Sequence, residues 1–393
     1  MSNLLDAGEA PTALRPQARE GVRPRESRPL PPLYATGFAI ASIGGPVALV
    51  YQLLPDVIGD TAMPSIGLVL LLALALFAFP LAVWWRFSGR VTSAGGLYGF
   101  VEAAAGRTAA RVHGAIWTVS YFLYLPATAT FLVYEILPAV APGVASYRPA
   151  LQLLLPVGFA AAVLAPLRLS LPPLAAIGVL QLVLLLVLGG LEMSRVGFPL
   201  ASLAPHGNAG AVARGVPTSS LLLLCASLPL YLGAAVVGGI ALVAAIPLAA
   251  VAPSVLAGEL PAQTLAGAYG GHALAVTASV ATLASVASLV FAEYLALGRL
   301  LRTATGIRER HGVLGIGAAF LLADALALLG PDRAYESVLR PSLAALYLSQ
   351  LAVFVVYPRF ERRRPLAAVA VAAVAAAPLV WGLYLVASNR IAS

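Results

Sequence analysis

The chain has 393 residues, of which 60% are hydrophobic and only 10% are charged. Soluble proteins carry roughly 25% charged residues, so this composition excludes a soluble globular protein. It predicts an all-α polytopic membrane protein that lies in a lipid bilayer. The net charge is +8. The basic residues are all arginines and gather in particular loops, so we expect membrane orientation and no nucleic-acid partner.

Residues 1–33 are rich in proline and arginine and contain no long apolar stretch. A secretory signal peptide needs such a stretch, so this segment is not one. We expect a disordered tail on the cytoplasmic side of the membrane.

Eleven apolar segments follow, each near the length of about 20 residues that a membrane-spanning helix needs. Proline residues delimit most of them. The predicted spans are 34–54, 64–86, 112–137, 150–167, 172–191, 219–238, 239–257, 273–298, 313–330, 336–357 and 366–387.

The arginines orient these spans. With the N-terminus inside, the inner segments hold 18 of the 24 arginines and the outer segments hold 6. Cytoplasmic loops carry such an excess, so we expect a multi-pass protein of the cell (inner) membrane with its N-terminus in the cytoplasm. The junction between the sixth and seventh spans carries no charge.

Two spans are interrupted by helix-breaking residues at corresponding places in the two halves of the chain. Residues 41–46 read ASIGGP in the first span, and residues 226–233 read ASLPLYLG in the sixth. Lipid offers no partner for free backbone groups, so a break must be buried in protein or line a cavity. Paired breaks point to the binding site of a transporter. The alternative is a glycine-proline kink used only for packing.

A broken helix exposes backbone N–H groups and a positive helix end, which bind an anion such as a carboxylate. The second break offers carbonyl oxygens to an ammonium group. A zwitterionic amino acid fits this pair of partial charges. The substrate-binding residues predicted at the breaks are Ser42, Ile43, Gly44, Gly45, Ser227, Leu228, Tyr231 and Gly233.

Three further segments carry a family resemblance. Residues 93–107 read SAGGLYGFVEAAAGR, residues 297–302 read LGRLLR and residues 355–360 read VVYPRF. With the broken first span, they resemble the amino acid–polyamine–organocation (APC) permeases over most of residues 34–360. The resemblance implies a leucine-transporter-like fold of about 11 transmembrane helices. Two inverted repeats of five helices would have broken helices 1 and 6, followed by one extra helix.

This fold would divide the chain into several parts. They are a first five-helix repeat at 34–191, an extracytoplasmic loop at 192–218, a second repeat at 219–358 and an extra C-terminal helix at 359–393. Members of the family commonly have twelve helices, and many carry charged residues between helices 6 and 7. The present chain has neither feature, which keeps open a membrane sensor or partner subunit that retains the fold without transport.

The third predicted span carries a polar and aromatic stripe. Its residues fall on one side of a helix, and such a face should not contact lipid. It either lines the substrate path or packs against other helices. In the middle of the span, Tyr121 and Tyr124 are the predicted ligand contacts. The stripe consists of His113, Trp117, Tyr121, Tyr124, Thr128, Phe131 and Glu135.

Four residues are candidates for ion coupling. Asp324 is placed near the middle of the ninth span, where a carboxylate is costly and by default a functional hypothesis. A neutral, hydrogen-bonded structural carboxyl is the alternative. In the family's sodium users, hydroxyls of the eighth helix bind the ion, and Thr282, Ser285 and Ser288 are available there. Such residues also serve as contacts between helices, so H⁺ and Na⁺ both stay open.

Enzymatic chemistry has little support. The four histidines are widely separated, and the single cysteine lies in an apolar segment. We therefore expect no enzyme, no metal site and no cofactor. The resemblance and the paired breaks predict a secondary transporter that moves an amino acid or related small amine by alternating access. The alternatives are a transporter of another substrate, such as a polyamine or nucleobase, and the non-transporting protein.

Overall fold

The computed structural model is all-helical over the part of the chain that it describes. This part belongs to a single compact unit formed by residues 32–393. The described residues are 47, 50, 51, 63–91, 93, 95–197, 199–206, 209–226, 244–251, 255 and 260–388.

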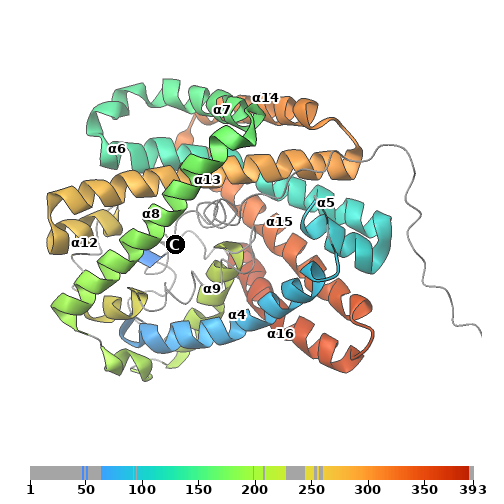
Figure 1. Ribbon diagram of the computed structural model, residues 1–393, viewed down its shortest axis with the longest axis horizontal. Coiled ribbons are helices and arrows are strands. Elements are labelled where there is room, and N and C mark those ends of the chain that lie inside the picture. The colour runs from blue at the N-terminus through green and yellow to red at the C-terminus, as the bar shows by residue number, and fades with distance from the viewer. Residues whose placement is uncertain are drawn as a thin grey trace, which may run out of the picture. The chain divides into compact units, whose positions relative to one another are not determined.

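The described residues of this unit form ten helices of ten residues or more (Figure 1). They are α4 (Ile66–Ser88), α5 (Leu97–Phe131), α7 (Arg148–Leu164), α8 (Leu167–Val196), α9 (Ala209–Ala226), α12 (Pro261–Gly270), α13 (His272–Thr305), α14 (Glu309–Ala327), α15 (Pro331–Phe360) and α16 (Pro365–Ala387). The short connecting elements are η2 (Met63–Ser65), the π-helical η3 (Leu132–Ile136), α6 (Leu137–Val140), η4 (Pro142–Tyr147), η5 (Leu200–Leu203) and η6 (Ile246–Ala250).

Eight helical segments are long and apolar enough to cross a membrane, and α9 is a shorter apolar helix. The prediction of an all-helical polytopic membrane protein is therefore confirmed. The eight segments correspond to eight of the eleven predicted spans. The predicted spans 34–54, 219–238 and 239–257 fall largely outside the described residues, and the inverted repeat stays a prediction.

Two helices extend beyond the predicted spans. Helix α9 begins at Ala209, within the segment 192–218 that was predicted as an extracytoplasmic loop, and the division into domains stays a prediction. The first turns of α9 contain Arg214 and Pro217, which lower the local hydropathy without preventing a helix. The third span is also longer than expected, since α5 begins at Leu97. Gly106 interrupts α5 with a φ of 82°, a backbone conformation that glycine adopts without strain.

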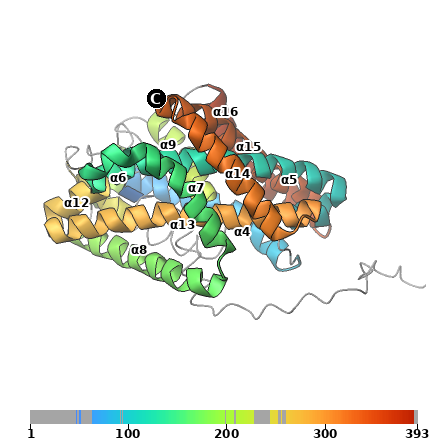
Figure 2. The same cartoon turned by 90° about the horizontal axis from the view of Figure 1, so that it is seen from above.

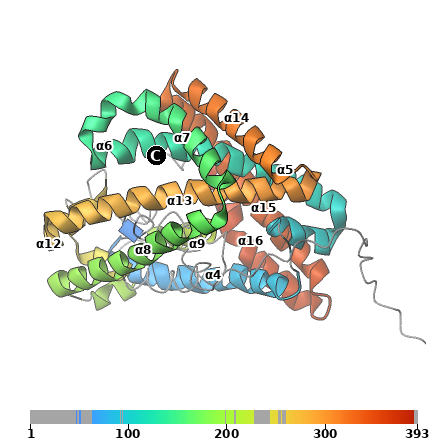
Figure 3. The same ribbon diagram turned by 45° about the horizontal axis from the view of Figure 1, so that its top comes forward.

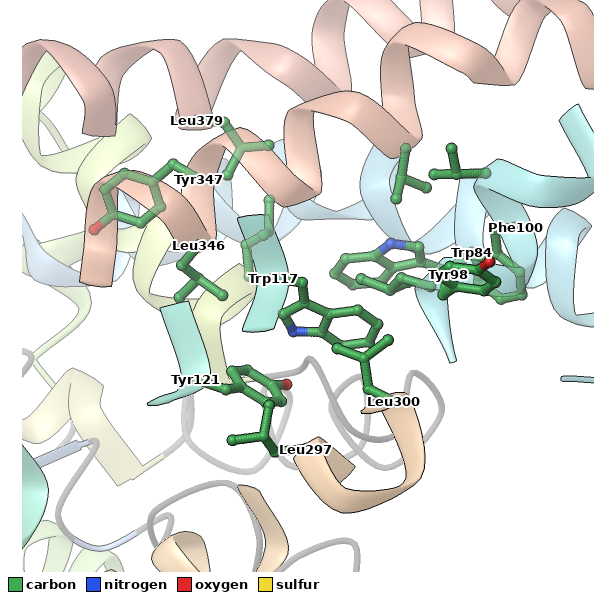
Figure 4. Packing of buried hydrophobic residues seen from close by; sticks show 14 of the residues in the cluster. Trp84, Tyr98, Phe100, Trp117, Tyr121, Leu297, Leu300, Leu346, Tyr347 and Leu379 are labelled. Atoms are coloured by element: carbon green, nitrogen blue, oxygen red, sulfur yellow. The ribbon is translucent and has the colours of Figure 1, made fainter. Parts of the chain in front are cut away.

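The helices enclose two large apolar cores. The first lies mainly between α4, α5, α13, α15 and α16, and its close-up shows Trp84, Trp117 and Tyr121 among leucines (Figure 4). At one end of this core, Phe87 stacks on Phe100 with ring centroids 4.8 Å apart and on Phe360 at 4.3 Å. These rings connect α4 to α5 and α15.

The second core joins α8 to the first predicted span. Val47, Val50 and Tyr51 are almost fully buried there against leucines of α8 and alanines of α12 and α13. Helix α13 takes part in both cores, and it runs lengthwise between α7 and α8 (Figures 2 and 3).

Glycine allows α16 to approach its neighbours closely at one point. A methyl group on Gly382 would lie 2.7 Å from the side chain of Leu221 in α9 and 2.8 Å from the ring of Tyr347 in α15. Close approach through small residues is a common way for membrane helices to associate. Gly382 therefore fixes the distance between α16 and two other helices.

We expect Gly382→Ala to destabilise the protein by about 1–3 kcal/mol, because the added methyl group overpacks a filled contact. The midpoint of thermal unfolding in detergent would fall. Gly315→Ala on α14 is the matched control, since a methyl group there meets no atom within 4 Å. Equal midpoints for the two variants would contradict the close contact.

Candidate functional site

A side chain of α8 binds the backbone of the first predicted span. The N–H of Val47 donates to Oε1 of Gln181 at 3.3 Å, and this contact is buried. Residues in the first turn of a helix have N–H groups without an intrahelical partner. Val47 follows directly after the predicted break at 41–46, so Gln181 supplies a partner for a backbone group at that place.

A second polar residue of α8 faces the same span. Glu192 is fully buried, and neither of its carboxyl oxygens has a hydrogen-bond partner among the described residues. The hydroxyl of Tyr51 faces this carboxyl. The two groups do not reach hydrogen-bonding geometry. Gln181 and Glu192 lie about three turns apart on one face of α8, and both point at the first span.

The stripe predicted on the third span is partly confirmed. His113, Trp117 and Tyr121 are each at most 6% exposed, so this part of the face avoids lipid. Thr128 is also buried, whereas Tyr124 and Phe131 are half-buried and Glu135 is exposed. The stripe therefore turns from the interior to the surface along α5.

The buried part of the stripe packs against α15 and α13. Nε2 of His113 donates to the carbonyl of Ser349 at 3.1 Å, and Trp117 meets Tyr121 edge-on with centroids 5.3 Å apart. Tyr121 lies beside Leu297 of α13 (Figure 4). Packing between helices thus accounts for much of the stripe, and ligand contact by Tyr121 and Tyr124 stays a prediction.

The three hydroxyl residues of α13 are buried. Ser288 donates to the carbonyl of Ala284 at 2.7 Å, which satisfies its hydroxyl within the helix. Ser285 is fully buried, and its hydroxyl has no hydrogen-bond partner in the described part of the chain. Thr282 is 3% exposed. Donation by a hydroxyl leaves the lone pairs of its oxygen free, so none of the three is excluded as a cation ligand, and their role in ion binding is untested.

Asp324 lies elsewhere. It is fully buried and lies in the last turn of α14, which ends at Ala327. Its depth in the membrane and its role in ion coupling stay predictions. Gln152 of α7 approaches the carboxyl and donates to the hydroxyl of Thr130 at 2.9 Å. This polar cluster joins α5, α7 and α14, away from the contact between α8 and the first span.

The residues at the two breaks cannot be placed. Ser42, Ile43, Gly44 and Gly45 lie outside the described residues, as do Ser227, Leu228, Tyr231 and Gly233. Among the residues that are described, no group of three or more histidines, cysteines or acidic residues could hold a metal ion.

Sequence reasoning missed Gln181 and Glu192. Both interrupt a leucine-rich segment, and their spacing puts them on one face of a helix. A polar residue inside a membrane helix is a functional hypothesis by default, so this spacing was the available signal. The sequence pattern could not show that Gln181 contacts Val47, because Val47 lies 134 residues away along the chain.

No family model matches the chain, and no curated protein matches it by sequence. Solved structures do match. Two variants of the manganese transporter of Eremococcus coleocola are 12% and 11% identical to the chain, each with a TM-score of 0.51. Each match covers 92% of this chain and 91% of the transporter. The chain therefore has the fold of a solved membrane transporter, and the narrower resemblance to APC permeases rests on the sequence alone.

We expect Gln181→Leu to destabilise the protein by about 1–3 kcal/mol, because the buried N–H of Val47 loses its acceptor. Thermal unfolding in detergent measures the change. The control is Gln263→Leu on α12, where the side chain is half-buried and the removed amide satisfies no buried backbone group that we observe. An unchanged midpoint for Gln181→Leu would show that Val47 does not depend on this contact.

Proposed function

We propose that this protein is a secondary transporter that moves a small solute across the membrane by alternating access. The observation that carries the proposal is the likeness to a solved membrane transporter over 92% of the chain. At 12% identity this likeness gives the fold, and the transport activity is our inference from it. The APC-like segments in the sequence support the same activity.

The contact between Gln181 and Val47 adds support. Non-helical backbone at membrane depth is tolerated where protein groups satisfy it, and in transporters such places hold substrate. A side chain from α8 that accepts from the N–H just after the predicted first break is what a broken, protein-buried helix requires.

The chemical groups at the two predicted breaks limit which class of substrate can bind there. The solved neighbours are named for manganese, which favours the alternative of a substrate other than an amino acid. Transition-metal ions prefer imidazole, thiolate or carboxylate ligands. Residues 34–54 contain no histidine, cysteine, methionine or acidic residue, and the predicted sixth span at 219–238 contains only Cys225 among these types. A metal ion is therefore poorly served at these breaks.

Backbone N–H groups, carbonyl oxygens and a few hydroxyls remain available at the breaks. These groups suit a small polar organic solute. We therefore propose an organic substrate without an amino acid headgroup, such as a polyamine or a nucleobase. A zwitterionic amino acid is the second candidate, because the opposite partial charges of two broken helices would match its two ends.

The experiment is a thermal-stabilisation panel on the purified full-length protein, with polyamines, nucleobases, amino acids and Mn²⁺ as separate probes. A ligand that binds the folded state raises its stability by about 2.7 kcal/mol at a concentration of 100 times Kd. We expect an organic solute to raise the unfolding midpoint. We also expect Gly45→Leu, which fills the first break, to abolish this shift.

Gly315→Leu on the open face of α14 is the control and should keep the shift. A positive solute is then tested for saturable uptake into liposomes that contain the protein. Stabilisation by Mn²⁺ alone would overturn our choice of substrate. Binding without any flux would instead favour a non-transporting sensor with this fold.

A further inference from the structure

Glu192 is a buried carboxyl that the fold gives no cation. It is fully buried, and neither oxygen has a hydrogen-bond partner in the described part of the chain. Arg195 lies one turn further along α8, but it is exposed and forms no ion pair with Glu192. An unpaired charge in such a place costs far more free energy than a neutral, protonated carboxyl does.

The described residues of the elements packed against α8 supply no positive partner either. The first span contributes Tyr51, whose hydroxyl faces the carboxyl. Helix α12 contributes Tyr269, and η6 carries no titratable residue. Helix α13 contributes His272, which is exposed. It also contains Glu293, which lies about six turns from His272 along the helix. The rest of the surroundings is the second apolar core, including Leu185 and Leu188.

A protonated carboxyl would complete this arrangement. Its O–H is a donor and the oxygen of Tyr51 is an acceptor, so a small shift would make a hydrogen bond where neither group now has one. An ionised carboxylate would instead accept from the O–H of Tyr51, but its charge would stay buried without a cation among the described residues. Burial of the carboxyl therefore favours a neutral Glu192 over a charged one.

We propose that Glu192 is a proton-binding site and that its proton couples the movement of the first span against α8 to the proton gradient. This inference rests on the proposed transport function. Val47 and Tyr51 are one helical turn apart, and α8 contacts them through Gln181 and Glu192 respectively. Separation of Tyr51 from α8 would admit water to Glu192, which then releases the proton. Return of the contact requires the proton to be bound again.

The coupling follows from linkage. A proton that binds one conformation better than another shifts the balance between them, and the effect is reciprocal. Of the other buried carboxyls, Asp324 lies in the cluster between α5, α7 and α14. Its titration would not act directly on the first span. Glu192 is the carboxyl whose charge acts on a contact of the broken helix.

The first test is infrared spectroscopy of the full chain in lipid during a pH titration, where a protonated carboxyl has its own C=O band. We expect Glu192→Gln to lose the band of one carboxylic acid near neutral pH and Tyr51→Phe to shift the frequency of that band. Glu336→Gln, at an exposed site on α15, should leave it unchanged. An identical spectrum for wild type and Glu192→Gln would overturn the proposal. This measurement does not depend on transport.

The second test is thermal unfolding of the same variants from mildly acidic to mildly alkaline pH. The wild type should lose stability as the pH rises, because the folded state holds the proton of Glu192 over a range in which the unfolded chain has released it. The Glu192→Gln variant should lose measurably less stability over this pH range, whereas Glu336→Gln should lose as much as the wild type. Equal losses in all three would contradict a proton site at Glu192. A positive result here, together with no flux of any solute in liposomes, would leave the proton site standing and remove the transport function.

Discussion

The structure depends on one constraint, which is that backbone N–H and C=O groups in a membrane must find partners within the protein. Long helices satisfy this requirement for eight segments of the chain. In the first predicted span, the backbone N–H of Val47 donates to Gln181 of α8. This buried contact is the kind of partner that a break at 41–46 would require. The packing of α8 against the first span follows from the same requirement.

Helix α8 thus combines two different tasks on one face. Leucines between Gln181 and Glu192 bury apolar surface against Val47, Val50 and Tyr51. The two polar residues bound this apolar stretch, one with a satisfied hydrogen bond and the other without. An apolar seam is permissive about small movements, because contacts between leucines are not directional. The two polar residues have directional contacts, so a shift of α8 relative to Val47 and Tyr51 would change their contacts more than those of the leucines.

Much of the fold could be predicted from hydropathy, and the exceptions have physical causes. The predicted span at 273–298 became the longer helix His272–Thr305, because hydropathy ends where arginine begins while the helix continues into water. Helix α9 begins at Ala209, since Arg214 and Pro217 lie within its first three turns without breaking it. For the site, the sequence predicts a break at 41–46, whereas the partner of Val47 is determined by tertiary packing. The glutamate on α8 was overlooked because no motif contains it.

The division of α13 between the two cores has a mechanical consequence. Its contribution to the second core consists of Ala275, Ala278 and Ala281, whereas its contribution to the first core includes Phe291, Tyr294 and Leu297. Large interlocking side chains resist sliding, because any displacement forces them out of low-energy rotamers. Alanines present a smooth surface that permits it. Helix α13 is therefore interlocked most firmly in the first core, and a small tilt of its N-terminal half, which lies in the same core as Val47 and α8, would disturb fewer interlocking side chains.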